Sequence, residues 1–214
     1  MASPKREGLP SFWTSHLARA LSGDQPCNLV TWLGGHHFLE KRPREDASSL
    51  ALWKTNHTAL LNTVIKDLRT QQWKCSVESF FRVRGQSAIL SGKADVIAQQ
   101  KDRRPLIVDA KSGQPRETDI VQVMIEMVMV PLAWSSPTMI FDGLVVYKTH
   151  RVPVLPMQAE ALKPRIFALL KELGTMPRPE PSPSKSNCQW CEVAEGDCAD
   201  RWQEVTQAEA VTEF

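Results

Sequence analysis

The feature that most constrains the fold of this chain is a short apolar run that ends in two charged residues. The run 106–108 reads Leu-Ile-Val, as a buried strand does, and Asp109 and Lys111 continue the same pattern. Residues i and i+2 of a strand point to one face of a sheet, so Asp109 and Lys111 share a face. Because a charge at the end of a buried strand is costly without a partner or a task, this strand end is the first candidate for a functional site.

Around this strand the sequence predicts a mixed α/β sheet flanked by helices. Alternating apolar and polar residues over 73–84 indicate a strand, whereas apolar residues spaced three and four apart over 50–68 indicate a helix. The expected order is helix 12–21, a short segment 26–33, helix 50–68, strands 73–84, 88–99 and 106–111, helix 118–132, strand 139–148 and helix 160–173. We expect Pro164 to fall in the first turn of the last helix, where proline is tolerated.

The composition changes along the chain and predicts five segments. Prolines at alternate positions in 177–186 indicate an extended linker. Seven acids and one base fall within 187–214, which leaves a net charge of +8 on residues 1–186 although the whole chain carries only +2. The expected segments are a flexible arm at 1–11, a core with an N-terminal helical part at 12–176, the linker at 177–186, a cysteine-bearing segment at 187–200 and an acidic tail at 201–214.

A second carboxylate is expected beside the first. Asp95 lies in the strand 88–99, and the polar turn 100–105 folds that strand back on the next one, which can bring Asp95 next to Asp109. Two neighbouring carboxylates repel each other unless a cation lies nearby, and Mg²⁺ or Mn²⁺ prefers such oxygen ligands. Lys111 can then stabilise a developing negative charge and orient a water molecule. The alternative is a strand-end ion pair between Asp109 and Lys111, with Asp95 as a turn residue.

These motifs carry a resemblance to a known family. The chain reads GKADVI at 92–97, VDAKSG at 108–113, and has Gln122 in the following helix. The segment 77–122 therefore resembles the PD-(D/E)XK nuclease superfamily, and most of all its RecB-type branch. The resemblance implies a restriction-endonuclease-like fold and metal-dependent hydrolysis of phosphodiester bonds. It also implies that Asp95 and Asp109 are metal ligands, that Lys111 is the catalytic lysine, and that the Ala110 carbonyl completes the metal's ligand shell.

The resemblance further implies a metal-binding histidine on the helix that precedes the strands. His57 matches that place, and the alternative is a partly buried surface histidine among apolar neighbours. The pair His36 and His37 is a rival with weaker placement, better read as a polar loop after two glycines.

One residue departs from the family pattern. The fourth residue after Gln122 is usually a tyrosine facing the substrate, and here it is Glu126. Residues i and i+4 share a helix face, so Glu126 lies near Gln122 and could bind a second metal or pair with Lys111. The departure also keeps open a second function, namely an inactive or weakly active DNA-binding scaffold subunit of a larger nuclease, defence or CRISPR-adaptation complex.

The cysteines form a second constellation. Cys188 and Cys191 are spaced as Cys-x-x-Cys, Cys198 follows, and Cys27 lies far upstream. Cys75 falls on the apolar face of its strand and is read as a core residue. The other four suffice for a tetrahedral thiolate site, which either Zn²⁺ or a [4Fe–4S] cluster accepts.

This layout is similar to the iron–sulfur branch of the RecB-type nucleases, which includes AddB-type nuclease domains and small CRISPR-adaptation nucleases. The resemblance favours a structural [4Fe–4S] cluster over Zn²⁺. Such a cluster would join the N-terminal helices to the C-terminal segment and thereby close a very long loop.

The expected substrate is DNA, as single strands or ends. A basic body fits a polyanion, and the substrate-binding candidates are Gln122, Arg82, Arg84 and Lys93. Trp53 and Trp73 could stack on bases, but both lie on periodic apolar faces, which favours a core position. No Gly-x-x-x-x-Gly-Lys-Ser/Thr motif is present, so a helicase, integrase or other partner would act in trans, with antiviral defence among the compatible pathways.

The sequence also predicts a location. Residues 1–8 are polar and charged, and no apolar segment follows them. No apolar run reaches the length of a membrane span. We therefore expect a cytoplasmic protein with neither a signal peptide nor a membrane association.

Overall fold

The computed structural model describes residues 3–24, 27–39, 47–188 and 191–202. Most of the predicted acidic tail, 201–214, lies outside the described residues. Within the described part of the chain, no helix is both long and apolar enough to cross a membrane.

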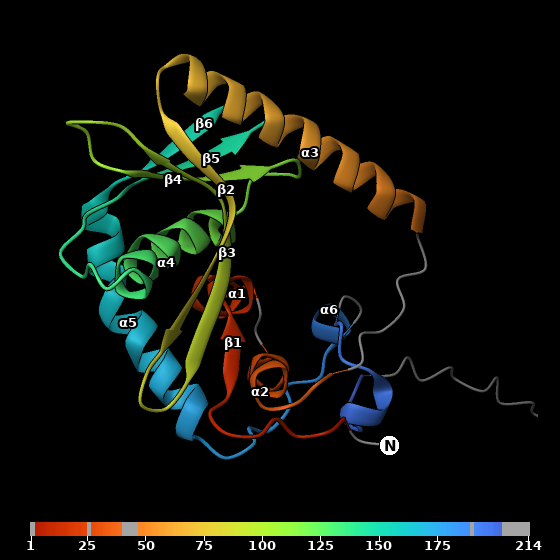
Figure 1. Cartoon of the computed structure of the whole chain (residues 1–214). Coiled ribbons are helices and arrows are strands. Elements are labelled where there is room, and N and C mark those ends of the chain that lie inside the picture. The colour runs from red at the N-terminus through yellow and green to blue at the C-terminus, as the bar shows by residue number, and fades with distance from the viewer. Residues whose placement is uncertain (1–2, 25–26, 40–46, 189–190, 203–214) are drawn as a thin grey trace, which may run out of the picture.

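A single mixed sheet forms the centre of the molecule (Figure 1). β2, β3 and β4 are joined antiparallel, β5 is parallel to β4, β6 is antiparallel to β5, and β1 runs parallel to β3. The strands are β1 (Ser11–Trp13), β2 (Lys74–Arg84), β3 (Ile89–Gln99), β4 (Leu106–Lys111), β5 (Asp142–Tyr147) and β6 (Arg151–Val154).

Helices cover both faces of this sheet. α3 lies on one face, and α4 and α5 lie on the other (Figure 1). The helices are α1 (Thr14–Ser22), α2 (Asn28–His36), α3 (Ala47–Thr70), α4 (Glu117–Ala133), α5 (Pro156–Thr175) and the short α6 (Lys185–Cys188), with a 3-10 turn η1 at Glu195–Asp197. This arrangement confirms the expected mixed α/β sheet flanked by helices.

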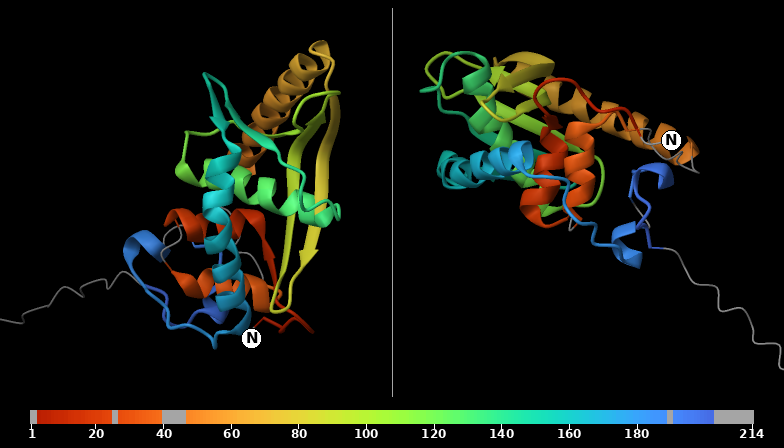
Figure 2. Two further views of the ribbon diagram at one scale, coloured as in Figure 1. Left: turned by 90° about the vertical axis from the view of Figure 1, so that its left-hand side faces the viewer. Right: turned by 90° about the horizontal axis from the view of Figure 1, so that it is seen from below.

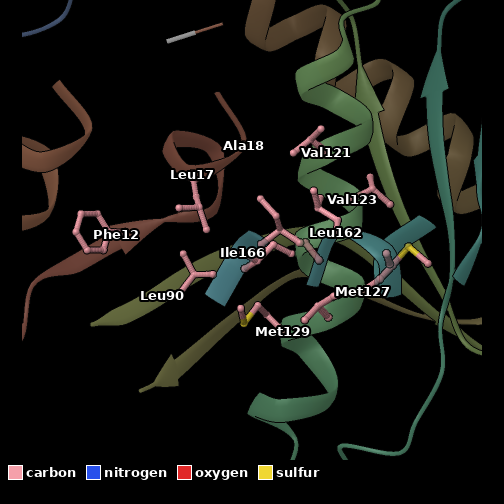
Figure 3. Close-up of a cluster of buried hydrophobic side chains, with 14 of the residues drawn as sticks. Phe12, Leu17, Ala18, Leu90, Val121, Val123, Met127, Met129, Leu162 and Ile166 are labelled. Atoms are coloured by element: carbon pink, nitrogen blue, oxygen red, sulfur yellow. The ribbon is translucent and has the colours of Figure 1, made fainter. Parts of the chain in front are cut away.

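Two hydrophobic cores hold the layers together. The larger core lies between the sheet and the helices α1, α2, α4 and α5, and includes Leu17, Leu90 and Ile166 (Figure 3). The smaller core lies under the C-terminal half of α3, whose buried residues recur at helical spacing: Leu61, Val64, Ile65 and Leu68. Residues 51–55 of α3 are exposed, because a helix of 24 residues is about 36 Å long and extends past the sheet (Figure 1).

The sheet opens along one edge of β3. β1 pairs with β3 only as far as Ser91, and β4 pairs with it only from Val96 onward. The segment 92–95 therefore has no strand beside it on that edge, and the last three residues of β4 pair only with β5. Such an opening leaves room for side chains that point out of both strands.

Three details differ from the sequence expectations. The predicted helix 12–21 begins only at Thr14, because 11–13 pair with β3 as a short edge strand. Pro164 lies inside α5, because the helix starts eight residues earlier, at Pro156. β6 lies between the expected strand 139–148 and helix 160–173, and it contains Pro153, which an edge strand tolerates.

The C-terminal segment folds back beside the N-terminal helices. Figure 2 shows α6 and η1 near α2, at the end of the molecule away from β5 and β6. One pocket is lined both by α2 residues and by residues from 181 to 201. The extended stretch 177–184, which contains no regular element, connects α5 to this position.

Candidate active site

Asp95 lies at the opening in the sheet. The pairing of β2 with β3 passes from Val77–Val96 to Ser79–Ala94, so Glu78 and Asp95 are left out of the ladder. Glu78 has a left-handed φ of 48°, as in an irregular point of a strand. The backbone N–H of Ala110 donates to Asp95 Oδ2 at 2.9 Å. The Asp95 carboxylate therefore replaces a strand partner and holds the end of β4 beside β3.

Asp109 and Lys111 form a buried ion pair at the end of β4. Asp109 Oδ2 lies 2.9 Å from Lys111 Nζ, and the aspartate side chain is only 2% exposed. Burial raises the pKa of Asp109 to about 7, although the Lys111 ammonium acts in the opposite direction and Asp95 adds to the rise. Burial alone would lower the pKa of Lys111, but the charge of Asp109 outweighs it and the pKa is raised. The lysine is therefore held in its charged form.

Gln122 and Glu126 of α4 complete the cluster from the other side. Gln122 Nε2 donates to Asp109 Oδ1 at 3.2 Å and to Glu126 Oε1 at 3.1 Å, while Lys111 Nζ donates to Gln122 Oε1 at 3.2 Å. Glu126 is fully buried, and its burial together with the charge of Asp109 raises its pKa well above the ordinary value. The Gln122 amide, a predicted substrate contact, is thus engaged by side chains of the site.

His57 approaches the cluster from α3. Its Nε2 lies 3.9 Å from Asp95 Oδ2, and its ring stacks on Trp53 with centroids 5.3 Å apart. Trp53 is 50% exposed, so its predicted core position is wrong. The structure brings His57 to the carboxylates and places His36 elsewhere, stacked on Trp32 and hydrogen-bonded to the carbonyl of Leu173.

The three basic substrate-binding candidates take different places. Lys93 Nζ pairs with Glu78 at 2.6 Å, next to the irregular point of β2. Arg82 and Arg84 lie opposite Ser91 and Ile89, farther along the hairpin from Asp95. The structure therefore brings only Lys93 near the carboxylates.

The side chains at this opening carry the types of donor atom that a divalent cation binds. Asp109 Oδ2 accepts no well-aligned hydrogen bond despite its ion-pair contact, and Glu126 Oε2 has no hydrogen-bond partner. A buried carboxylate oxygen without any partner, as Glu126 Oε2 is, is rare in folded proteins and calls for an explanation such as strain, a catalytic role or a bound ion. As the side chains lie, no three His, Cys, Asp or Glu residues within the described ranges are close enough to hold a metal ion. The Lys111 ammonium occupies the position beside Asp109 where a cation would bind.

Four of the five cysteines gather at the other end of the molecule. Cys27, Cys188, Cys191 and Cys198 line one pocket, as free thiols, between α2 and the C-terminal segment. Burial raises the pKa of Cys191 and of Cys198, and their sulfur neighbours, Cys27 among them, contribute further to the rise. The fifth, Cys75, is half-buried against the smaller core, close to its predicted position.

The segment that carries these cysteines is held by specific contacts. The guanidinium of Arg201 donates to the carbonyls of Val193 at 2.9 Å and Cys188 at 2.5 Å. The backbone N–H of Trp202 donates to Cys188 Sγ at 3.4 Å. An N–H directed at a cysteine sulfur is a contact that also occurs in bound metal clusters. As the side chains lie, no three of the described cysteines are close enough together to hold a metal ion.

Two features of the site do not follow from the sequence. Glu126 departs from the family pattern, but that departure does not reveal its complete burial beside Asp109. The spacing of Trp53 continues the apolar face of α3 and therefore predicts a core position. The length of α3 relative to the sheet would reveal that Trp53 is exposed, but the sequence does not show where the sheet ends.

Comparisons with known proteins add little to this geometry. No protein-family model matches the chain, and no curated protein matches it. The structure is similar to a solved protein described as SSO0001, with 11% sequence identity, a TM-score of 0.43, and coverage of 87% of this chain and 85% of the other. It is also similar to the alkaline exonuclease LHK-Exo from Laribacter hongkongensis, with 10% identity, a TM-score of 0.40, and coverage of 77% and 88%. Because both similarities are low, a function must be argued from the residues of the site.

Proposed function

We propose that this chain is a metal-dependent nuclease of the PD-(D/E)XK type that hydrolyses phosphodiester bonds in DNA. The observation that carries the proposal is the convergence of Asp95, Asp109, Lys111 and His57 on one opening of the sheet. The sequence motifs at 92–97 and 108–113 support it independently. A structural ion pair alone would explain Asp109 and Lys111, but not the buried Glu126 beside them, whose Oε2 has no hydrogen-bond partner.

The residues that would hold Mg²⁺ or Mn²⁺ are Asp95, Asp109 and His57, with the Ala110 carbonyl as a further ligand. Carboxylate and carbonyl oxygens are the ligands these ions prefer, and Mn²⁺ also accepts an imidazole. The ion would act as a Lewis acid on the scissile phosphate and on a water molecule. For an ion to reach Asp109 Oδ2, the Lys111 ammonium, which lies 2.9 Å from that oxygen, would have to move away.

Lys111 and Gln122 position the reacting groups. Lys111 stays protonated because of the surrounding carboxylates, so its ammonium can donate to a phosphate oxygen and stabilise the negative charge that develops there. Gln122 donates to two carboxylates and accepts from Lys111, which fixes the direction of the lysine side chain. One neutral amide thereby connects the carboxyl groups of Asp109 and Glu126 with the Lys111 ammonium.

Single-stranded DNA is the proposed substrate class. Trp53 presents a half-exposed indole ring, stacked on His57, at the edge of the carboxylate cluster. An exposed aromatic ring beside a hydrolytic centre suits an unpaired base, because a base inside a DNA duplex is already stacked on its neighbours and cannot stack on the protein. Lys93 lies near enough to contribute a phosphate contact if it leaves Glu78.

The cysteine pocket is proposed to hold a [4Fe–4S] cluster, with Zn²⁺ as the alternative. The four thiols come from α2's N-terminal end and from the C-terminal segment, so a bound centre would tie these two parts together. Its proposed role is structural, since it lies at the end of the molecule away from the carboxylates. Absorption at roughly 400 nm separates the two candidates, because Zn²⁺ sites are colourless.

The test is cleavage of end-labelled single- and double-stranded DNA by the full chain, purified without oxygen, in Mn²⁺, Mg²⁺ or chelator. Asp109→Asn should lower the cleavage rate at least about 100-fold. Loss of a residue that only hydrogen-bonds a metal ligand costs about 10–100-fold, and loss of the ligand itself should cost more. Asp142→Asn serves as the control, because Asp142 is a surface residue at the start of β5 that pairs with Arg104.

The outcomes decide between the enzyme and a scaffold. Metal-dependent cutting that Asp109→Asn loses and Asp142→Asn keeps would establish the nuclease, and the two labelled ends would give its polarity. DNA binding in chelator, with no cutting under either metal, would replace the proposal with a non-catalytic DNA-binding subunit that acts with a helicase, integrase or other partner.

A further inference from the structure

Two large aromatic side chains lie in contact on the outside of the sheet. Trp13, at the end of β1, is 43% exposed, and Phe80, in β2, is 59% exposed. Their ring centroids lie 6.2 Å apart, with an angle of 66° between the ring planes. Single exposed apolar residues are common on protein surfaces, but adjoining ones form a patch, and large apolar patches mark binding surfaces.

Strand pairing places both rings on one side of the β2–β3 hairpin. Residues directly opposite each other in paired strands point to the same side of a sheet, and so do residues i and i+2 of one strand. Trp13 pairs with Ser91, and Phe80 pairs with Lys93. The neighbouring Phe81 points the other way and is buried in the larger core. The two rings therefore lie on the solvent side of the hairpin.

Helix α3 leaves this part of the solvent side open. It packs over the other half of the hairpin, where Val96 and Ala98 belong to the smaller core. Figure 1 shows α3 at the end of the sheet that carries β5 and β6, with the rest of the hairpin extending away from it. We call the open surface the hairpin face, and its exposed residues are Trp13, Phe80, Arg82, Arg84 and Lys93.

The hairpin face carries positive charge. Among the described residues, Lys93 pairs with Glu78 at 2.6 Å, whereas Arg82 and Arg84 have no acidic partner. Glu78 and Asp95 are the acids of β2 and β3. Bases beside exposed rings complement a polyanion that also offers flat apolar groups, as single-stranded DNA does. A duplex would match the charge, but its bases are stacked on one another and leave the rings without a partner.

The hairpin face begins next to the carboxylates. Lys93, opposite Phe80, lies two residues before Asp95, and Ser91, opposite Trp13, lies four residues before it. At about 3.3 Å per residue, these positions are about 7 and 13 Å from Asp95 along β3. A strand of stacked nucleotides advances about 3.4 Å per nucleotide, so about two to four nucleotides cover the distance.

We propose that the hairpin face binds single-stranded DNA, with bases stacked on Trp13 and Phe80 and phosphates held by Arg82, Arg84 and Lys93. The inference rests on the proposed nuclease, because it supplies the path along which a strand reaches the carboxylates. It adds Trp13 and Phe80, which no sequence motif indicates, to the residues that contact the substrate.

Binding of labelled oligo-dT of about 12 nucleotides to the full chain in chelator, followed by fluorescence anisotropy, tests the rings. Trp13→Ala and Phe80→Ala should each weaken binding by about 5- to 150-fold, which is the range for the loss of one stacked base. Phe80→Leu keeps the apolar bulk without a flat ring and should also weaken binding, whereas Phe80→Trp should keep it. The matched controls are Trp134→Ala, just after α4, and Phe167→Ala in α5, which remove exposed rings elsewhere and should leave binding unchanged.

Salt dependence tests the bases of the hairpin face. Each phosphate contact to a single strand contributes about 0.7 to the slope of log affinity against log salt concentration. Arg82→Gln should therefore reduce this slope by about 0.7. Lys171→Gln, which removes an exposed base from α5, should leave the slope unchanged. Equal slopes for wild type and Arg82→Gln would overturn the phosphate contacts of the hairpin face.

A structural role for the rings has a different signature. If the pair only holds β1 on β3, Trp13→Ala and Phe80→Ala lower the melting temperature, while the folded variants bind oligo-dT as wild type does. Unchanged binding by both variants overturns the proposal, whatever their stability. Unchanged binding together with a wild-type dimer that Phe80→Ala dissociates, as measured by light scattering, would assign the hairpin face to a second copy of the chain.

Failure of the hairpin face and failure of the nuclease can be told apart, because binding is measured in chelator. Weaker binding by the ring variants, with no DNA cleavage by wild type, would keep the hairpin face and remove the nuclease. Cleavage that Asp109→Asn loses, with unchanged binding by the ring variants, would keep the nuclease and remove the hairpin face. No binding of oligo-dT by wild type would also overturn the hairpin face.

Discussion

Gly92→Ala provides the sharpest test of how the sheet is packed beside the carboxylate cluster. Gly92 lies three residues before Asp95, at the point where β1 has left β3. A Cβ atom at position 92 would be 2.2 Å from Thr14 Oγ1 and 2.3 Å from Phe81 Cζ. Thr14 and Phe81 are both buried, so neither side chain can turn into solvent to make room.

The expected cost follows from these contacts. Forcing a methyl group into a well-packed core costs about 1–3 kcal/mol. The Thr14 hydroxyl also donates to the Ser91 carbonyl at 3.1 Å, and displacing it would remove a buried hydrogen bond worth about 1 kcal/mol. We therefore expect Gly92→Ala to lower the free energy of unfolding by about 2–4 kcal/mol.

Equilibrium unfolding in urea, followed by far-ultraviolet circular dichroism, measures this effect. Gly113→Ala is the matched control, because a Cβ at position 113 would have no neighbour within 4 Å. That control should stay within about 0.5 kcal/mol of wild type. The slope of unfolding with urea should be the same in all three proteins, so that the midpoint reports stability.

An unchanged midpoint for Gly92→Ala would refute the reasoning. It would mean that α1 does not pack on β3 at position 92, and that the opening at the carboxylates is wider than described. Equal losses in Gly92→Ala and Gly113→Ala would point to glycine's backbone freedom, and the contact with Thr14 would not be the cause.

Further predictions concern the charged cluster, the exposed ring and the cysteines. Burial raises the pKa of Asp109 from 3.8 to about 7. Between these pH values Asp109 therefore binds a proton more strongly in the folded state than in the unfolded state. In chelator, the free energy of unfolding of wild type relative to that of Asp109→Asn should therefore fall by on the order of 4 kcal/mol as the pH rises from about 4 to about 7. Urea unfolding of both proteins at several pH values measures this difference, and a difference that does not change with pH would contradict the prediction. Trp53→Ala should weaken the binding of single-stranded DNA by about 1–3 kcal/mol, as measured by fluorescence anisotropy. Trp134→Ala, which removes another exposed tryptophan just after α4, should leave binding unchanged, and equal effects of the two variants would rule out stacking on Trp53. Cys191→Ser should abolish absorption at roughly 400 nm and lower the melting temperature, whereas Cys75→Ser should keep the absorption. A wild-type protein that is colourless and contains zinc would replace the iron–sulfur cluster with a Zn²⁺ site.

The local elements of this fold were largely readable from the sequence. Alternation over 73–84 and the apolar run 106–108 predicted β2 and β4, and helical spacing predicted α3 and α4. Local periodicity is written into neighbouring residues, because the same pattern that marks a strand or helix also decides which face is buried. Boundaries were less certain, as the start of α5 at Pro156 shows.

The site was readable only in part. Asp109 and Lys111 could be placed together because residues i and i+2 of a strand share a face. Asp95 could be placed beside them because a short turn folds its strand back on the strand that carries Asp109. His57 could be proposed only through the family resemblance, since nothing local ties α3 to Asp95. Glu126 was visible as an odd acid, but its burial depends on how α4 packs against the sheet.

Local sequence patterns are enough to predict the strand that ends in Asp109 and Lys111, the mixed α/β sheet and the set of cysteines available for a thiolate centre. Three other features depend on how the layers pack: α3 extends past the sheet and exposes Trp53, Glu126 is enclosed beside Asp109, and Cys27 meets the C-terminal cysteines in one pocket. The difference arises because patterns in sequence record local geometry. Burial and charge balance are set by residues far apart in the chain, which meet only when the layers pack.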